Sequence, residues 1–124
     1  MTTHQYKKLK VWQDSIALSV DIYKITELFP QHEQFGLISQ LRRASVSIPS
    51  NIAEGSKRGT KKDFISFLRI AHGSGAEIET QLLIARELNF INNENYGKLL
   101  ISIEEIMAMI ASFIKSVSAS ASEV

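Results

Sequence analysis

The sequence lacks cysteine and contains few residues that interrupt a helix. Its 124 residues include no cysteine, two prolines and six glycines. Without cysteine the chain has no disulfide, no thiolate nucleophile and no zinc–thiolate site, which fits a reducing cytoplasm. Residues 1–8 place no apolar segment behind their positive charge, so a secretory signal is not expected there.

An excess of either charge is also missing. Fourteen Lys and Arg residues stand against thirteen Asp and Glu, a formal net charge of +1, so no global field selects a nucleic acid, an anionic membrane or an acidic ligand. Residues 99–114 form the richest apolar run, which Glu104 and Glu105 interrupt and which is shorter than the roughly 20 residues of a membrane span. We therefore expect one soluble, cytoplasmic domain that does not enter a membrane.

Helical periodicity and turn signals predict four helices in a small all-α bundle. The first covers residues 10–28 and ends before Pro30, and the second begins near residue 34 and ends at residues 55–57. Residues 60–63 resemble a capping box, so the third helix begins at Lys61 and ends near Asn89. Asn92 or Asn93 caps the fourth. The domain covers residues 1–117, and the Ser/Ala segment 118–124 is expected to be disordered.

The second helix contains the most distinctive stretch of the chain. Its apolar period passes undisturbed through Pro49, although a proline removes one backbone hydrogen bond. We expect one helix kinked at Pro49, with hydroxyls nearby that could satisfy the disturbed backbone groups; the alternative is that Pro49 starts a separate short helix. These hydroxyls belong to Ser45, Ser47 and Ser50, and the opposite face carries a polar stripe of Arg43, Ser47, Ser50 and Glu54.

Two features predict close helix packing. The first helix carries two apolar rows, which are Leu9, Trp12, Ile16, Val20 and Tyr23, and Val11, Leu18, Ile22, Ile25 and Phe29. One core needs a single row, so the other is expected to lie against a second subunit, unless the small bundle engulfs the helix. Gly73 and Gly75 lie within the third helix, where they indicate either close approach of a neighbouring helix or a helix break.

Residues that carry chemistry are sparse. The residue three before His72 is Arg69, so the Glu-x-x-His pairs of a di-iron bundle are missing. No phosphate-binding Gly-x-x-x-x-Gly-Lys loop, nucleophile elbow or His-Glu-x-x-His pair occurs. The sequence therefore predicts no enzyme, no catalytic residue, no metal and no cofactor.

The sharpest basic feature surrounds the connection between the second and third helices. Lys57, Arg58, Lys61 and Lys62 lie next to a helix N-terminus, where they could contact phosphates; a solvated basic loop is the alternative. Arg42 is a further candidate, and the N-terminal arm carries Lys7, Lys8 and Lys10. Cyclic assembly would repeat the basic loop as a ring of charge.

The chain resembles the bacterial 23S rRNA intervening-sequence proteins, also called four-helix-bundle proteins. The resemblance covers roughly residues 8–117 and is carried by Leu-Lys-Val-Trp at 9–12, Gln-Leu-Arg-Arg-Ala at 40–44, Ser-Ile-Pro-Ser-Asn-Ile-Ala-Glu-Gly at 47–55, Phe-Ile-Ser-Phe-Leu at 64–68 and Glu-Ile-Glu-Thr-Gln-Leu at 77–82. It implies an antiparallel up-and-down four-helix bundle in a ring-shaped homopentamer without catalytic residues. A relative, the accessory variability determinant of diversity-generating retroelements, resembles the same pentameric bundle and binds reverse transcriptase and nucleic acid.

Two hypotheses about function remain open from the sequence. In the first, a non-enzymatic oligomer binds RNA or DNA through basic loops repeated around a ring. In the second, the bundle docks another protein and does not touch nucleic acid. In either case Arg43, Asn51 and Glu54 are expected to form a buried or intersubunit polar network, in which a lone charge would be costly.

Overall fold

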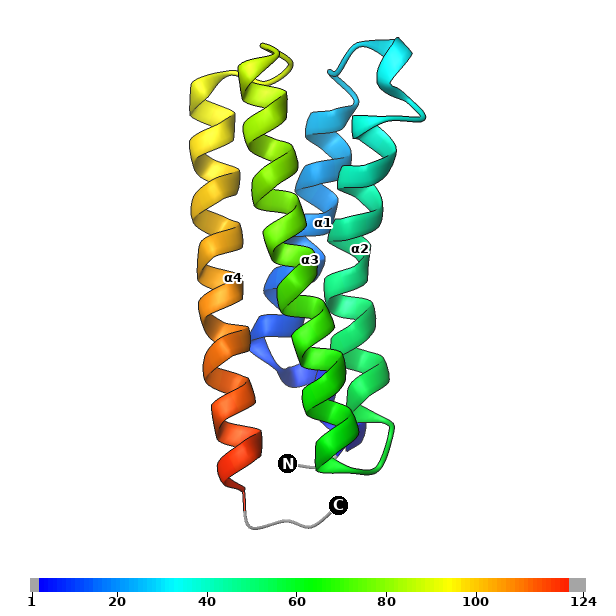
Figure 1. Ribbon diagram of the computed structural model, residues 1–124, viewed down its shortest axis with the longest axis vertical. Coiled ribbons are helices and arrows are strands. Elements are labelled where there is room, and N and C mark those ends of the chain that lie inside the picture. The colour runs from blue at the N-terminus through cyan, green and yellow to red at the C-terminus, as the bar shows by residue number, and fades with distance from the viewer. Residues whose placement is uncertain (1–2, 121–124) are drawn as a thin grey trace.

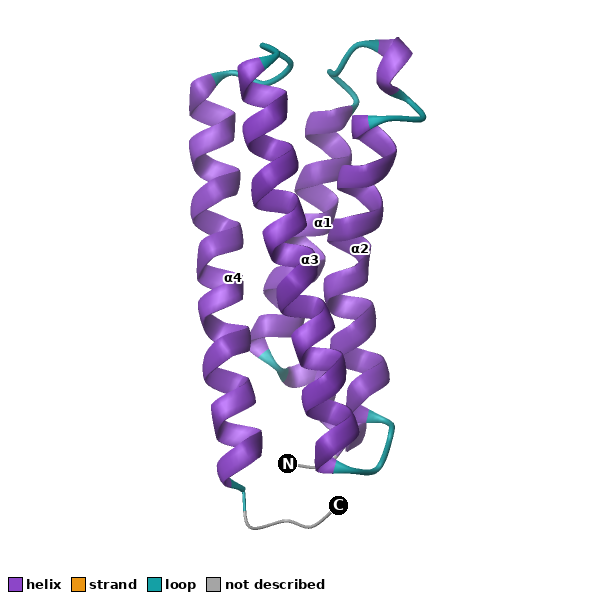
Figure 2. Cartoon of the chain, in the orientation of Figure 1, coloured by secondary structure: helices purple, strands orange, loops and turns teal. Residues whose placement is uncertain are grey.

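The computed structural model describes residues 3–120, which form four α-helices and two short 3-10 helices. The 3-10 helix η1 (Thr3–Lys8) precedes α1 (Lys10–Thr26), and η2 (Gln31–Glu33) lies between α1 and α2 (Leu37–Ser56). Helices α3 (Lys61–Glu87) and α4 (Asn93–Ala119) follow. No strand occurs within the described residues, so the predicted all-α four-helix fold is confirmed (Figure 1, Figure 2).

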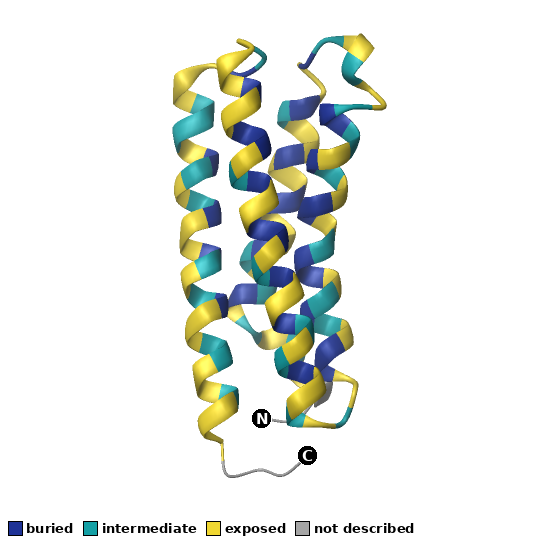
Figure 3. Cartoon of the chain, in the orientation of Figure 1, coloured by how far each residue is buried: buried dark blue, intermediate teal, exposed yellow. Residues whose placement is uncertain are grey.

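The helices alternate in direction and enclose a single core. Each packs against the helices next to it in the sequence, and α1 also contacts α4, so the four close into a bundle. Figure 1 shows η1, the α2–α3 connection and the end of α4 at one end of the bundle, and η2 and the α3–α4 connection at the other. In Figure 3 the buried residues lie on the faces that the helices turn toward one another. The fully buried large side chains are Leu18, Ile22, Leu41, Ile48, Ile52, Leu68, Ile78, Leu82, Ile103 and Ile110.

Helix α2 is continuous through the buried Pro49, so the alternative of a separate helix starting there is wrong. The serine hydroxyls around it join helices. Ser45 Oγ lies 3.1 Å from Ser19 Oγ on α1, and Ser74 Oγ on α3 donates to Ser47 Oγ at 2.9 Å. These contacts fix the positions of α1, α2 and α3 relative to one another along the bundle axis. The angle of the kink at Pro49 stays a prediction.

Several helix ends differ from the predicted ones. Helix α1 ends at Thr26 instead of 28, and α2 begins at Leu37 instead of near 34, because η2 occupies residues 31–33. Glu33 Oε1 accepts the Leu37 backbone N–H at 3.0 Å and thereby caps α2 from outside. The predicted start of α3 at Lys61 is confirmed, and the Thr60 side chain accepts the Asp63 N–H at 3.1 Å.

Helix α3 runs through both of its glycines, so the predicted alternative of a break is wrong. An alanine Cβ at Gly75 would lie 2.6 Å from Met107 Cγ on α4, so this glycine permits close packing. The helix ends at Glu87, two residues before the predicted end, and Asn89 adopts a left-handed φ of 61°. The N–H of Phe90 then bonds to the Ala85 carbonyl at 2.9 Å, which closes the helix end.

Helix α4 begins after Asn92, whose side chain accepts the Asn95 N–H at 2.7 Å, and extends to Ala119. The predicted boundary of the disordered tail at Ser118 is therefore corrected. Lys61 Nζ donates to the carbonyls of Ser118 at 3.4 Å and Ser120 at 2.8 Å, and this contact holds the last turn. Residues 121–124 of the predicted tail lie outside the described residues. Over residues 3–120, no helix is both long and apolar enough to cross a bilayer.

Candidate functional site

The four basic residues of the α2–α3 connection have different roles in the structure. Lys61 holds the end of α4, as described above. The Arg58 guanidinium lies 4.9 Å from the centroid of the Phe67 ring and 3.7 Å from the Glu54 carboxylate. Lys57 and Lys62 are exposed at the surface. Of the predicted cluster, Lys57 and Lys62 are therefore the side chains best placed to meet an external anion.

Tertiary packing brings further lysines to the same end of the bundle. Lys57 Nζ lies 6.0 Å from the centroid of the Tyr6 ring, which places η1, with Lys7 and Lys8, beside the α2–α3 connection. Lys115 is exposed in the last turns of α4. We call this surface the basic end; it consists of Lys7, Lys8, Lys57, Arg58, Lys61, Lys62 and Lys115, together with the carboxylates of Glu54 and Asp63.

The charge of the molecule is separated along its length. The basic end carries seven basic side chains and two carboxylates, a net charge of +5. The rest of residues 3–120 carries seven basic side chains and ten carboxylates, a net charge of −3. A formal net charge of +1 for the whole chain therefore conceals a strongly basic surface at one end. Sequence reasoning identified the arm and the connection as separate clusters and missed Lys115, because their proximity depends on the antiparallel packing.

Arg42 does not belong to this surface. It lies fifteen positions before Lys57 on α2, which corresponds to about 22 Å along a helix. Its guanidinium donates to Thr26 Oγ1 at 2.9 Å and Glu27 Oε1 at 3.1 Å, and it stacks on the Tyr23 ring at 4.6 Å. Within the chain, Arg42 therefore ties α2 to the end of α1. The prediction that Arg42 contacts nucleic acid together with the loop lysines has no support in this arrangement.

The predicted polar network does not form inside one chain. Arg43 and Glu54 are exposed, and Glu54 pairs with Arg58. Asn51 Nδ2 donates to the carbonyl and the hydroxyl of Ser47, at 2.8 Å and 2.9 Å. The buried version of the network is therefore corrected, because these charged side chains remain in water. The intersubunit version stays a prediction.

The two apolar rows of α1 separate in part, because Leu9 and Trp12 of the row predicted to face a second subunit pack against the core. Val11, Leu18, Ile22 and Phe29 are buried, and Ile25 packs against the core. Ile16, Val20 and Tyr23 of the other row are 39%, 47% and 43% exposed. A bundle that engulfs α1 on all sides is therefore excluded, and an apolar surface is left uncovered on this helix.

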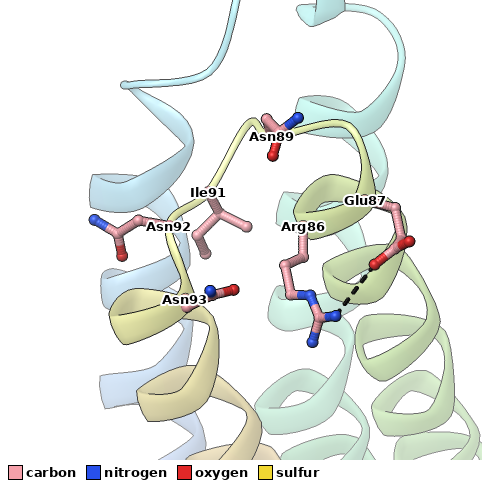
Figure 4. A pocket seen from close by; sticks show the side chains of 6 residues that line it. All are labelled: Arg86, Glu87, Asn89, Ile91, Asn92 and Asn93. Atoms are coloured by element: carbon pink, nitrogen blue, oxygen red, sulfur yellow. Dashed lines mark ion pairs between the residues drawn. The ribbon is translucent and has the colours of Figure 1, made fainter.

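A further hollow of about 470 Å³ lies at the end opposite the basic end, between α3 and α4 (Figure 4). It is lined by Arg86, Glu87, Asn89, Ile91, Asn92 and Asn93. Arg86 and Glu87 are its charged residues, and they pair with each other at 3.3 Å. The Arg86 guanidinium also lies 5.1 Å from the Tyr96 ring centroid. This hollow therefore offers asparagine amides and an internally paired arginine, without a nucleophile beside a base.

Metal binding finds no support in the described part of the chain. No group of three or more His, Asp or Glu side chains lies close enough there to hold a metal ion. His72 lies on α3 and is partly buried.

Comparison with known proteins identifies relatives of the whole bundle. A family model described as "23S rRNA-intervening sequence protein" matches residues 7–112. A crystal structure from Bacteroides thetaiotaomicron, described as a protein of unknown function from the S23 ribosomal protein family, is 29% identical. It aligns with a TM-score of 0.77 over 85% of this chain and 98% of that one. No curated protein matches the chain. Neither description names an enzymatic activity.

Proposed function

Because the chain belongs to the 23S rRNA-intervening sequence protein family, we propose that it is a non-enzymatic, self-associating helical bundle that binds RNA or DNA weakly through its basic end. The observation that carries this proposal is the net charge of +5 at the basic end, against −3 for the rest of the described chain. When lysines at such a surface contact nucleic-acid phosphates, the counterions condensed on the nucleic acid are released. This release supplies affinity without sequence recognition.

Self-association would strengthen this binding. The uncovered row of Ile16, Val20 and Tyr23 supports assembly, because monomeric proteins rarely leave contiguous apolar surface exposed. We propose a homopentamer on the basis of the family resemblance. A ring with its axis along the bundles would place every basic end on the same side, so several weak contacts would act together on one long polyanion.

The test is a titration of a fluorescently labelled structured RNA, and of a DNA duplex of equal length, at several salt concentrations. The wild-type protein should bind at low salt, and log K should fall linearly with log salt. The variant Lys57→Gln/Lys62→Gln removes two exposed charges that cap no helix, although Lys57 also lies 6.0 Å from the Tyr6 ring centroid. For each copy whose two lysines contact phosphates, the slope should fall by about 1.4 to 1.8, at about 0.7 to 0.9 for each contact.

A matched control neutralises Lys24 and Lys98, which lie toward the other end of the bundle. Lys24→Gln/Lys98→Gln removes the same total charge, so it should keep the wild-type salt slope. Absence of binding at low salt would refute the proposal. Equal slopes for the two double variants would show that net charge, and not the basic end, attracts the nucleic acid.

A second candidate function, docking of another protein, has its own supporting observation. Phe35 is 92% exposed and Leu28 75% exposed at the end opposite the basic end. Exposed aromatic side chains are common anchors in protein interfaces. A stoichiometric partner that remains bound after nuclease treatment and high salt, and is lost with Phe35→Ser, would favour this function.

A further inference from the structure

The basic end contains aromatic rings as well as lysines. Tyr6 on η1 and Phe67 on α3 are both half-buried there, and each carries a basic side chain of the α2–α3 connection over its ring. Proteins that bind unpaired nucleic-acid strands combine positive charge with aromatic side chains on which successive bases stack. The basic end therefore has both parts of a surface for unpaired nucleotides.

The Tyr6 ring is held in place but is not covered by another ring stacked parallel to it. Trp12 contacts it with 5.4 Å between the centroids and an angle of 75° between the planes, which is an edge contact. Lys57 Nζ lies 6.0 Å from the ring centroid, at the outer limit of a cation–π contact. Because the Lys57 side chain is exposed and long, a base can take its place over the ring while the ammonium binds the adjoining phosphate.

Arg58 supplies a second plane. Its guanidinium lies 4.9 Å from the Phe67 ring centroid, and its side chain is 51% exposed. A guanidinium is planar, and it stacks on nucleobases as well as on aromatic rings. The Glu54 carboxylate, 3.7 Å away, compensates part of the positive charge. Arg58 is therefore better suited to stacking than to holding a phosphate, which exposed Lys57 and Lys62 can do.

The two planes lie on either side of one short connection. Lys57 and Arg58 are consecutive residues, yet Lys57 reaches Tyr6 on η1 and Arg58 reaches Phe67 on α3. A strand that crosses the α2–α3 connection can thus place neighbouring bases on the two planes. A duplex cannot use them, because its bases are already paired and stacked inside the helix. Charge alone predicts the opposite preference, since duplex DNA carries one charge per about 1.7 Å of its axis.

We propose that the basic end binds unpaired nucleotides in preference to duplex, with one base stacked on the Tyr6 ring and a neighbouring base on the Arg58 guanidinium. Phe67 supports that guanidinium from below, and Lys57 and Lys62 bind the phosphates. This inference rests on the nucleic-acid binding of the proposed function and specifies the class of ligand. Each stacked base should raise the affinity by about 5- to 100-fold.

The experiment compares ligands that have the same number of phosphates. An oligothymidylate of about 12 nucleotides, within the roughly 4 to 16 that one small single-strand site covers, is titrated beside an abasic strand of equal length. A hairpin duplex with the same number of phosphates is the third ligand. The single strands are made as DNA and as RNA, with uracil as the RNA base. In both series the strand with bases should bind about tenfold more tightly than the abasic strand, and also more tightly than the hairpin.

Two variants remove one plane each and leave the charge unchanged. Tyr6→Leu and Arg58→Lys should each weaken binding of the strand with bases by about fivefold or more, and the salt slope should stay that of the wild type. Neither should change binding of the abasic strand. Tyr6→Phe keeps the ring and should bind both strands like the wild type. A purely structural role of Tyr6 beside Trp12 would instead weaken both strands equally, and that result would overturn the assignment.

Trp12 gives a readout that does not depend on affinity. It is the only tryptophan of the sequence, and it packs against Tyr6. A base stacked on Tyr6 lies near the indole, so the thymine strand should quench its fluorescence at saturation, whereas the abasic strand should not. Equal fluorescence with the two saturating strands would contradict a base on the Tyr6 ring.

The outcomes separate this inference from the proposed function. Equal affinities for the strand with bases and the abasic strand, or tighter binding of the hairpin, would overturn the stacking site and leave electrostatic binding at the basic end intact. Absence of binding to all of these ligands at low salt would refute the proposed function and this inference together.

Discussion

Gly55 and Gly73 both lie within helices, yet the structure predicts opposite effects when each is replaced by alanine. Gly55 lies in the last turn of α2, where an added Cβ would be 2.6 Å from Phe67 Cβ and 3.1 Å from Phe64 Cδ1 on α3. Ordinary carbon contacts are about 3.5 to 4.0 Å. Phe67 Cβ is attached directly to the backbone, so α2 and α3 would have to separate. At Gly73 an added Cβ meets nothing within 4 Å.

The two changes can be given magnitudes. Overpacking a tight contact costs about 1 to 3 kcal/mol, and alanine recovers up to about 1 kcal/mol of helix propensity. Gly55→Ala should therefore destabilise the bundle by about 1 to 2 kcal/mol. Gly73→Ala should stabilise a single chain by up to about 1 kcal/mol, since only the propensity changes. The two variants should differ by roughly 1 to 3 kcal/mol in free energy of unfolding.

Urea unfolding followed by circular dichroism measures this difference. Both variants are compared at three protein concentrations, so that a contribution from self-association appears as a concentration dependence of the midpoint. With m-values of about 1 to 3 kcal/mol/M, the midpoints should be separated by about 0.3 to 3 M. Equal midpoints, or a Gly55→Ala variant more stable than Gly73→Ala, would refute the close approach of α2 and α3 at Gly55.

Three further predictions follow from individual contacts. Lys61→Gln removes the donor to the Ser118 and Ser120 carbonyls, so hydrogen exchange of the amides in the last turn of α4 should become faster. The control Lys62→Gln should leave these exchange rates unchanged, and equal rates in the two variants would contradict the cap. The pKa of Lys10 is raised above 10.5 by its hydrogen bond to Asp14 and by the charge of that carboxylate. The small contribution of this pair to folding stability should therefore be complete below pH 10.5 and lost as pH rises through the folded-state pKa. An Asp14→Asn variant that shows the same alkaline loss of stability would contradict this. Glu54→Ala removes an exposed ion pair with Arg58 and should lower the unfolding free energy of a monomer by less than about 0.5 kcal/mol. If Glu54 lies between subunits, the same substitution should lower the mass or the melting temperature of the oligomer. No change in either would refute the predicted intersubunit polar network.

The helices were predictable because their signals are local. The capping residues Thr60 and Asn92 and the apolar period through Pro49 determined where helices begin and continue. Errors occurred at ends decided by neighbouring segments. Glu33 caps α2 from the preceding 3-10 helix, and Lys61 extends α4 through a contact fifty-nine positions away in the sequence, at Ser120. Periodicity carries no information about such partners.

Composition, periodicity and turn chemistry by themselves determined an all-α domain of four helices, and the two rows on α1 already indicated one apolar surface more than a single core needs. Only the tertiary structure decided which residues act together. In the folded chain the N-terminal arm, the α2–α3 connection and Lys115 lie together at the basic end. Arg42 lies apart from them, because its guanidinium donates hydrogen bonds to Thr26 and Glu27 at the end of α1. The physical reason is that a cluster of charges from different helices depends on the positions of those helices along the bundle axis. These positions are set by contacts such as Ser19 with Ser45 and Ser47 with Ser74, which join residues distant in the sequence.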